Sequence, residues 1–192
     1  MNVLANRHPG QKAIIVGCGP SITDLRYKDF PAGIVIAINH SILVVRALRL
    51  PNHVYSMQKD GCIIHGCNTQ VPIDRCICPG TEMVQPVEPE ELILTWAESS
   101  HCYAAYPLRH VVNVQEDLGL HWTVSSAPTA VKLAAYMGCT SLVMFGHDAY
   151  TTGDTGRIHG SAVIEDARAG YIISGQLAQA QAEALGLPVV WQ

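Results

Sequence analysis

Three residues that can bind polar ligands or exchange protons follow an apolar run near residue 145. His147, Asp148 and Tyr150 come directly after "LVMF", and His159 follows on a glycine-rich loop. A histidine exchanges protons near neutral pH, and a carboxylate or a phenol hydroxyl can bind a polar ligand. Packing of a strand gives no reason to place these side chains together. We therefore expect a functional site at this end of the run.

A second turn with glycines and a hydroxyl ends the apolar run Ala13–Val16, in the sequence "IIVGCGPS". Gly17 and Gly19 would let the backbone approach a ligand closely, and N–H groups near Ser21 could hold a phosphate. The spacing is not the dinucleotide fingerprint, because Ile22 stands where the third glycine is required, and no Gly-Lys-Ser/Thr of a Walker loop follows. A tight turn that leads into a short helix explains these residues equally well.

Two further segments carry polar residues beside apolar ones. In "GIVIAINHS" the run ends at Asn39, which can contact a base, a ribose or a phosphate, or can cap the next helix. Ser125 and Ser126 stand where a helix N-terminus offers N–H groups to an anion, and one of them also suits the N-cap position. Polar residues after two strands in succession favour a ligand site over unrelated caps.

Strands and helices alternate along the chain and would position these residues. Strands are predicted at Ala13–Gly17, Gly33–Asn39, Ser141–Phe145 and Leu187–Trp191, with a weaker one at His53–Met57. Helices are predicted at Ser41–Leu50, Ala127–Met137 and Val163–Leu185, the last interrupted by Gly170 and Gly175. This pattern is typical of a mainly parallel sheet with helices on both faces, which binds ligands beyond the carboxyl ends of its strands. The sequence therefore predicts a single Rossmann-like α/β domain over residues 1–192, with an irregular Cys- and Pro-rich segment at about 61–111.

Composition limits the classes of protein to consider. A chain of 192 residues with 48% hydrophobic and 15% charged residues suits one compact domain. A formal net charge of -4 provides no general surface for nucleic acid, and the apolar runs are too short to span a membrane. The N-terminal sequence lacks the apolar core of a signal peptide, so the seven cysteines suggest reduced thiols in the cytoplasm.

Five potential zinc ligands lie close together in the middle of the chain. They are Cys62, His65, Cys67, Cys76 and Cys78. Their spacings match the usual zinc knuckles poorly, and cysteine is also a common small core residue. We therefore assign no metal-binding residues, and leave open whether this cluster binds zinc.

Two blocks of this sequence resemble one superfamily of transferases. "VGCGPSITDLRYKDFP" followed by "VIAINHS" resembles the opening of the bacterial sialyltransferases of glycosyltransferase family 42. "SSAPTAVKLAAYMGCTSLVMFGHDAY" resembles both that family and the archaeal 6-hydroxymethyl-dihydropterin pyrophosphokinases, the MptE-like proteins. The resemblance covers residues 12–41 and 123–162. Cys18 departs from it, since the sialyltransferases often have asparagine there, and this chain is shorter than those enzymes.

The resemblance implies a nucleotide-binding site and a catalytic site. The residues that it assigns to the nucleotide are Gly17, Gly19, Pro20, Ser21, Asn39, Ser125, Ser126, Gly146 and Asp148. It further implies that Tyr150 stabilises the departing phosphate and that His159 is the general base. His147 is the rival candidate for this proton transfer.

The implied activity is that of a nucleotide-dependent transferase, namely a sialyltransferase-like glycosyltransferase with a nucleotide-sugar donor. A pyrophosphokinase that uses ATP and Mg²⁺, held near Asp148 or Asp154, is the first alternative. A module that binds a nucleotide without catalysis is the second. The expected partner is thus a small molecule, while the base, the transferred group, the acceptor and the oligomeric state stay open.

Overall fold

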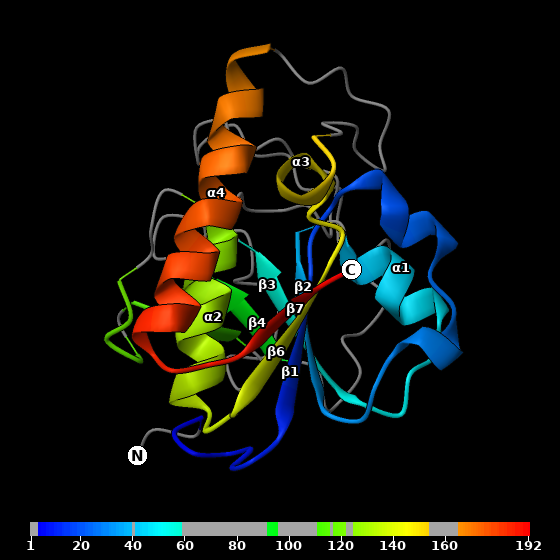
Figure 1. The fold of residues 1–192 in the computed structure, drawn as a ribbon. Helices are drawn as coiled ribbons and strands as arrows, with labels where there is room; N and C mark the ends of the chain where they lie inside the picture. Colours follow the sequence, from blue (N-terminus) through cyan, green and yellow to red (C-terminus); the bar gives the residue numbers. More distant parts are fainter. Residues whose placement is uncertain are drawn as a thin grey trace, which may run out of the picture.

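The computed structural model describes residues 4–39, 41–58, 92–95, 111–115, 117–121, 125–153 and 165–192 (Figure 1). Its strands are β1 (Lys12–Val16), β2 (Ile34–Ile38), β3 (His53–Gln58), β4 (Leu92–Thr95), β5 (Val111–Asn113), β6 (Ser141–Phe145) and β7 (Val189–Trp191). Its helices are α1 (Ser41–Ala47), α2 (Ser126–Tyr136), α3 (Asp148–Thr151) and α4 (Glu165–Ala184), with short 3₁₀ helices η1 (Pro20–Asp24) and η2 (Tyr27–Asp29). In these ranges the structure contains no helix that could span a lipid bilayer.

The strands form one sheet of seven, in the order β5-β4-β3-β2-β1-β6-β7. All neighbouring pairs are parallel, and Ile14 at the centre of β1 is aligned with Val35 of β2 and Val143 of β6. The predicted α/β fold with a mainly parallel sheet is therefore confirmed. The five predicted strands are also found, with the last starting at Val189 instead of Leu187.

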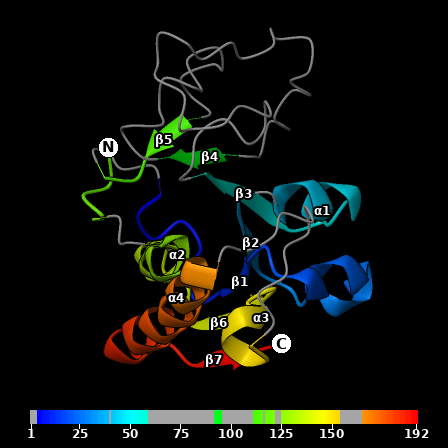
Figure 2. The same ribbon diagram turned by 90° about the horizontal axis from the view of Figure 1, so that it is seen from above.

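Alternate residues of the central strands contribute to two separate cores. Ile15 of β1 packs in a cluster that includes buried residues of α2 and α4, such as Val131 and Ala178. Ile14 packs in the other cluster, together with Ile22 of η1 and Ile42 of α1. Figure 2 shows α2 and α4 on one side of the sheet and α1 on the other. This arrangement holds the strand ends, and the loops that follow them, in fixed relative positions.

The glycines of α4 do not interrupt it, contrary to the sequence prediction. The helix is continuous over 20 residues from Glu165 to Ala184. Gly170 faces open space, while a side chain at Gly175 would overlap the ring of Tyr150. The second glycine is therefore a packing requirement, and the alanine and glutamine residues around it supply enough helix propensity to continue the helix.

Candidate functional site

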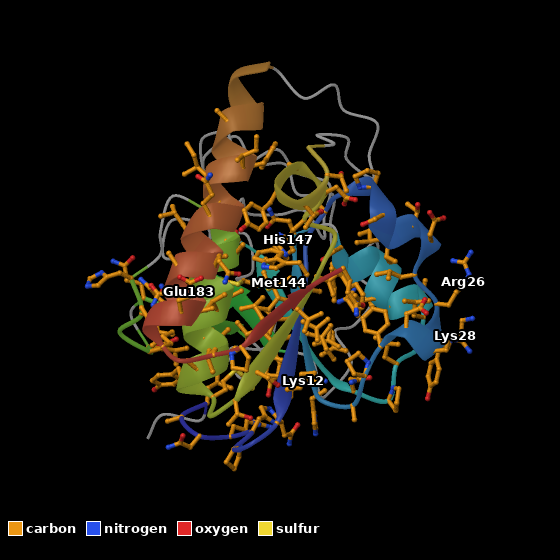
Figure 3. All side chains as sticks on the ribbon, in the orientation of Figure 1. Lys12, Arg26, Lys28, Met144, His147 and Glu183 are labelled. Carbon is orange, nitrogen blue, oxygen red and sulfur yellow. The ribbon has the colours of Figure 1, made fainter. Side chains whose placement is uncertain are left out.

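The order of the strands places a topological switch point between β1 and β6. The chain adds β2, β3, β4 and β5 in succession on one side of β1, and then adds β6 and β7 on the other side. Figure 3 shows Lys12, at the start of β1, and His147, after β6, at opposite ends of the sheet. The loops after β1 and β6 thus lie at the carboxyl edge, where open α/β sheets bind their ligands. We call residues 17–21 the β1 loop and residues 146–148 the β6 loop.

Hydrogen bonds join these two loops directly. The Gly19 N–H donates to the carbonyl oxygen of Gly146 over 2.8 Å. The Ser21 hydroxyl donates to Oδ2 of Asp148 over 2.9 Å, and the Asp148 carboxylate is buried. Two sequence blocks separated by more than a hundred residues therefore meet at the switch point, as the parallel sheet requires.

The glycines of the two loops are needed because the loops touch. A Cβ at Gly19 would overlap the Asp148 carboxylate, and one at Gly17 would lie 2.5 Å from the carbonyl oxygen of Gly146. Gly146 itself has φ of 68°, a left-handed conformation that L side chains rarely adopt, and a Cβ there would overlap Ile22 of η1. Close packing of the two loops, against backbone at Gly17 and against side chains at Gly19 and Gly146, is thus one physical reason for all three glycines.

The β1 loop directs most of its N–H groups to acceptors within the protein. Gly17 donates to the carbonyl of the last β6 residue over 2.8 Å, Gly19 donates to the β6 loop, and the Ser21 N–H lies 3.4 Å from Oδ2 of Asp148. Pro20 has no N–H to donate. At this edge of the sheet the structure thus places a hydroxyl beside a buried carboxylate. Such a pair binds hydroxyl groups of a ligand more readily than a bare phosphate.

Asn39 forms the turn from β2 into α1. Its φ of 52° is left-handed, a conformation that asparagine adopts more easily than most residues. Its N–H donates to Met57 of β3 over 2.9 Å. The neighbouring Ser41 is buried, and its hydroxyl lies 2.8 Å from the carbonyl oxygens of Val16 and of Ile38. Ser41, which the sequence prediction did not assign to the site, thereby ties the ends of β1 and β2 together.

The two serines before α2 have different environments. Ser125 is the N-cap residue, as one of the two alternatives predicted, but its side chain makes no hydrogen bond to the first turn. Its hydroxyl lies 2.6 Å from that of Ser174 in α4, whereas Ser126 is buried in the first turn. The contact of Ser125 is therefore with α4 and not with the β1 loop. Because α2 follows β5 in a parallel sheet, its N-terminus nevertheless lies at the carboxyl edge.

His147 lies at the N-cap of α3 with its ring between β1 and β7. Its Nε2 atom is buried and has no hydrogen-bond partner among the described residues. The ring meets that of Trp191 edge to face at 5.6 Å, and its Cε1 would be 3.0 Å from a Cβ at Gly17. Burial lowers the pKa of His147 from 6.5 to about 4. The imidazole is therefore neutral at physiological pH.

Tyr150 is held by aromatic packing one turn further along. Its ring lies 4.6 Å from that of Trp191 and covers Gly175 of α4. Trp191 is in turn oriented by a hydrogen bond of 2.8 Å from its Nε1 to Gln179. Sequence reasoning missed Trp191 and Gly175, which lie far along the chain. The one available indication was a glycine inside an otherwise strong helix.

The buried imidazole of His147 should make the protein less stable in acid. The unfolded chain protonates this residue below pH 6.5, whereas the folded chain does so only near pH 4. The unfolded state then binds more protons, so the free energy of unfolding should fall as the pH drops from 6.5 to 4. The two pKa values correspond to at most about 3 kcal/mol. Urea denaturation at several pH values measures this slope.

A matched variant separates His147 from the other histidines. Burial also lowers the pKa of His8, so the parent protein contains both contributions. The slope should become shallower in His147→Leu, and the slope that remains should include the contribution of His8. Identical slopes in the parent and in His147→Leu would show that the imidazole is not kept neutral by the fold.

Several predicted residues lie outside the described ranges. These are His159, Asp154 and the cysteine and histidine cluster Cys62, His65, Cys67, Cys76 and Cys78. Across the residues that the structure does describe, no three His, Cys, Asp or Glu side chains are grouped as a metal site. The general base and the zinc cluster stay predictions from the sequence.

Comparisons with protein-family models, with curated proteins and with solved structures find no match to this chain. The function of this protein must therefore be inferred from the residues of the site and from their geometry.

Proposed function

We propose that this protein is a nucleotide-dependent transferase with a Rossmann-like fold. The observation that carries the proposal is the meeting of the β1 and β6 loops at the switch point of a parallel sheet. The residues of both loops have the chemistry of a ligand site independently of their proximity. Ligand sites in sheets of this kind form at this position.

The described contacts suggest which elements would bind each part of a nucleotide. The Ser21 hydroxyl and the Asp148 carboxylate would bind hydroxyl groups at the crevice. The first turn of α2, after Ser125, would offer N–H groups and its dipole to a phosphate. Transfer of a glycosyl group from a nucleotide-sugar then requires a general base for the acceptor, for which His159 is the candidate.

A second candidate function is favoured by the buried Asp148 carboxylate. A pyrophosphokinase needs carboxylate oxygens to hold Mg²⁺ against the phosphates of ATP. Asp148, where the β1 and β6 loops meet, is the carboxylate that fits this task, provided that Mg²⁺ replaces the Ser21 hydroxyl as its partner. Such an enzyme would bind ATP only when Mg²⁺ is present.

A panel of nucleotides distinguishes these functions by thermal stability. A nucleotide at a hundred times its Kd should stabilise the folded state by about 2.7 kcal/mol. The glycosyltransferase should be stabilised by a cytidine or uridine nucleotide without a metal, and the pyrophosphokinase by ATP with Mg²⁺. Product analysis with the matching nucleotide-sugar or with ATP then tests turnover.

Two results would contradict the proposal. If no nucleotide stabilises the protein, with or without Mg²⁺, the protein has no nucleotide site of the kind proposed. Binding without transfer to any acceptor or water would leave a module that binds a nucleotide without catalysis. Asp148→Asn serves as a control, because it keeps the shape of the side chain and should weaken binding in either function.

A further inference from the structure

The unpartnered nitrogen of His147 is the least favourable polar group in the described part of the site. Nε2 is buried, and no donor or acceptor of the described residues reaches it. Leaving a buried polar atom unpaired destabilises a fold, whereas an apolar side chain of similar size would avoid the cost. The ring lies near the apolar ring of Trp191 and near the backbone at Gly17. Packing alone would therefore favour leucine or phenylalanine at this position.

The ring with this unfavourable unpaired nitrogen lies in the candidate functional site. His147 lies between Gly146 and Asp148, both of which contact the β1 loop. The residue as a whole is only partly buried, at the edge of the sheet where the two loops meet. Unfavourable polar groups of this kind collect where a protein binds a ligand, because the ligand supplies the missing hydrogen bond.

We propose that His147 binds a ribose hydroxyl of the nucleotide through Nε2 and does not transfer the proton in the reaction. This inference rests on the proposed function, since it assigns one contact within the same nucleotide site. The neighbouring Asp148 carboxylate and Ser21 hydroxyl, 2.9 Å apart, also suit a hydroxyl better than an anion.

The charge state of the ring supports a binding role. A neutral imidazole has one N–H donor and one acceptor, which matches a hydroxyl group, and it offers no positive charge to a phosphate. The lowered pKa of His147, caused by burial, also makes it a weak base at neutral pH. Proton transfer near neutrality would need a histidine in a more polar environment.

Affinity for matched nucleotides tests this contact. The probes are cytidine, uridine and adenosine monophosphates in their ribo, 2′-deoxy and 3′-deoxy forms, measured by calorimetry with the parent protein. We expect one deoxy form to bind about five- to tenfold more weakly, the effect of one neutral hydrogen bond. In His147→Leu the ribo form should lose the same factor, and the deoxy form should lose nothing further. His147→Gln, which keeps a hydrogen-bonding group, should recover part of the affinity.

Two further measurements show whether a loss of affinity in His147→Leu is caused by misfolding. His147→Leu should melt at the same temperature as the parent protein or higher, because it removes an unpaired buried nitrogen. The ¹⁵N resonance of His147 Nε2 should shift when the ribonucleotide is added to the parent, and shift less with the deoxy form that binds weakly. A residue with a purely structural role would give neither the selectivity for the hydroxyl nor this difference.

The outcomes separate the inference from the proposed function. If the nucleotide binds and His147→Leu weakens the ribo and deoxy forms equally or not at all, the contact is wrong and the transferase proposal stands. If His147→Leu binds normally and loses turnover, His147 is the proton-transfer residue and the inference is overturned. If the parent protein binds no nucleotide, both the inference and the proposed function fail.

Discussion

Replacing Gly19 with alanine should lower the free energy of unfolding by about 2.5–6 kcal/mol. The new methyl group would overlap the buried Asp148 carboxylate and lie 2.8 Å from the carbonyl oxygen of Gly146. Overfilling a packed site costs about 1–3 kcal/mol, and loss of the hydrogen bond from Ser21 to this carboxylate adds about 1.5–3 kcal/mol. Urea denaturation of the parent and the variant measures the difference.

A double-mutant cycle shows whether the Asp148 carboxylate is the group that the methyl displaces. Asp148→Ala removes the carboxylate and leaves room beside Gly19. Gly19→Ala should then cost markedly less in the Asp148→Ala background than in the parent protein. Equal costs in the two backgrounds would mean that the loops do not pack as described, and that the glycine serves another purpose.

The central elements could be predicted because the sequence encodes them locally. β1, β2 and β6 are continuous apolar runs, which is the pattern of a strand buried on both faces. Glycine or polar residues end each run, so the strand ends were predicted to within one residue. The meeting of the β1 and β6 loops then follows from a parallel sheet in which β6 lies next to β1.

The remaining elements are encoded by contacts and not by local pattern. β4 has four residues and β5 has three, which are too few to show the alternation of apolar and polar residues typical of a strand. β4 also lies within the segment predicted to be irregular, at about 61–111, and β5 lies at its end. They form strands because each has a neighbouring edge to pair with. β4 pairs with the edge of β3, and β5 pairs with the edge of β4. The sequence therefore predicted five of the seven strands, including those around the site, and missed β4 and β5 at the far edge.

The site shows a similar limit. A glycine can indicate that another group approaches the backbone closely, but the residue type alone does not identify that group. At Gly19 the described neighbour is the Asp148 carboxylate, and at Gly175 it is the ring of Tyr150. The burial of His147 against Trp191 could not be predicted either, because the two residues lie on different elements and share no sequence pattern. Only the fold brings such pairs together.

Replacing His159 with alanine should lower kcat by about 10²–10⁴-fold and leave the Kd of the nucleotide nearly unchanged. This is the usual contribution of a general base. The prediction rests on the resemblance of "RIHGSA" to the general-base loop of the sialyltransferases, since His159 lies outside the described residues. Turnover of a nucleotide-sugar and calorimetric binding of the matching nucleotide measure the two quantities.

His147→Leu is the matched comparison for this variant, because each replacement removes one imidazole from the same polar segment. We expect opposite effects: His159→Ala should lose turnover with binding intact, and His147→Leu should lose affinity while the bound donor still reacts. A pH profile adds an independent check, since kcat in the parent protein should fall as the pH drops through the pKa of the general base. If kcat of His159→Ala equals that of the parent, the loop that contains it has no part in proton transfer. The base must then be sought elsewhere in the site, and the turnover of His147→Leu shows whether the rival candidate His147 takes that role.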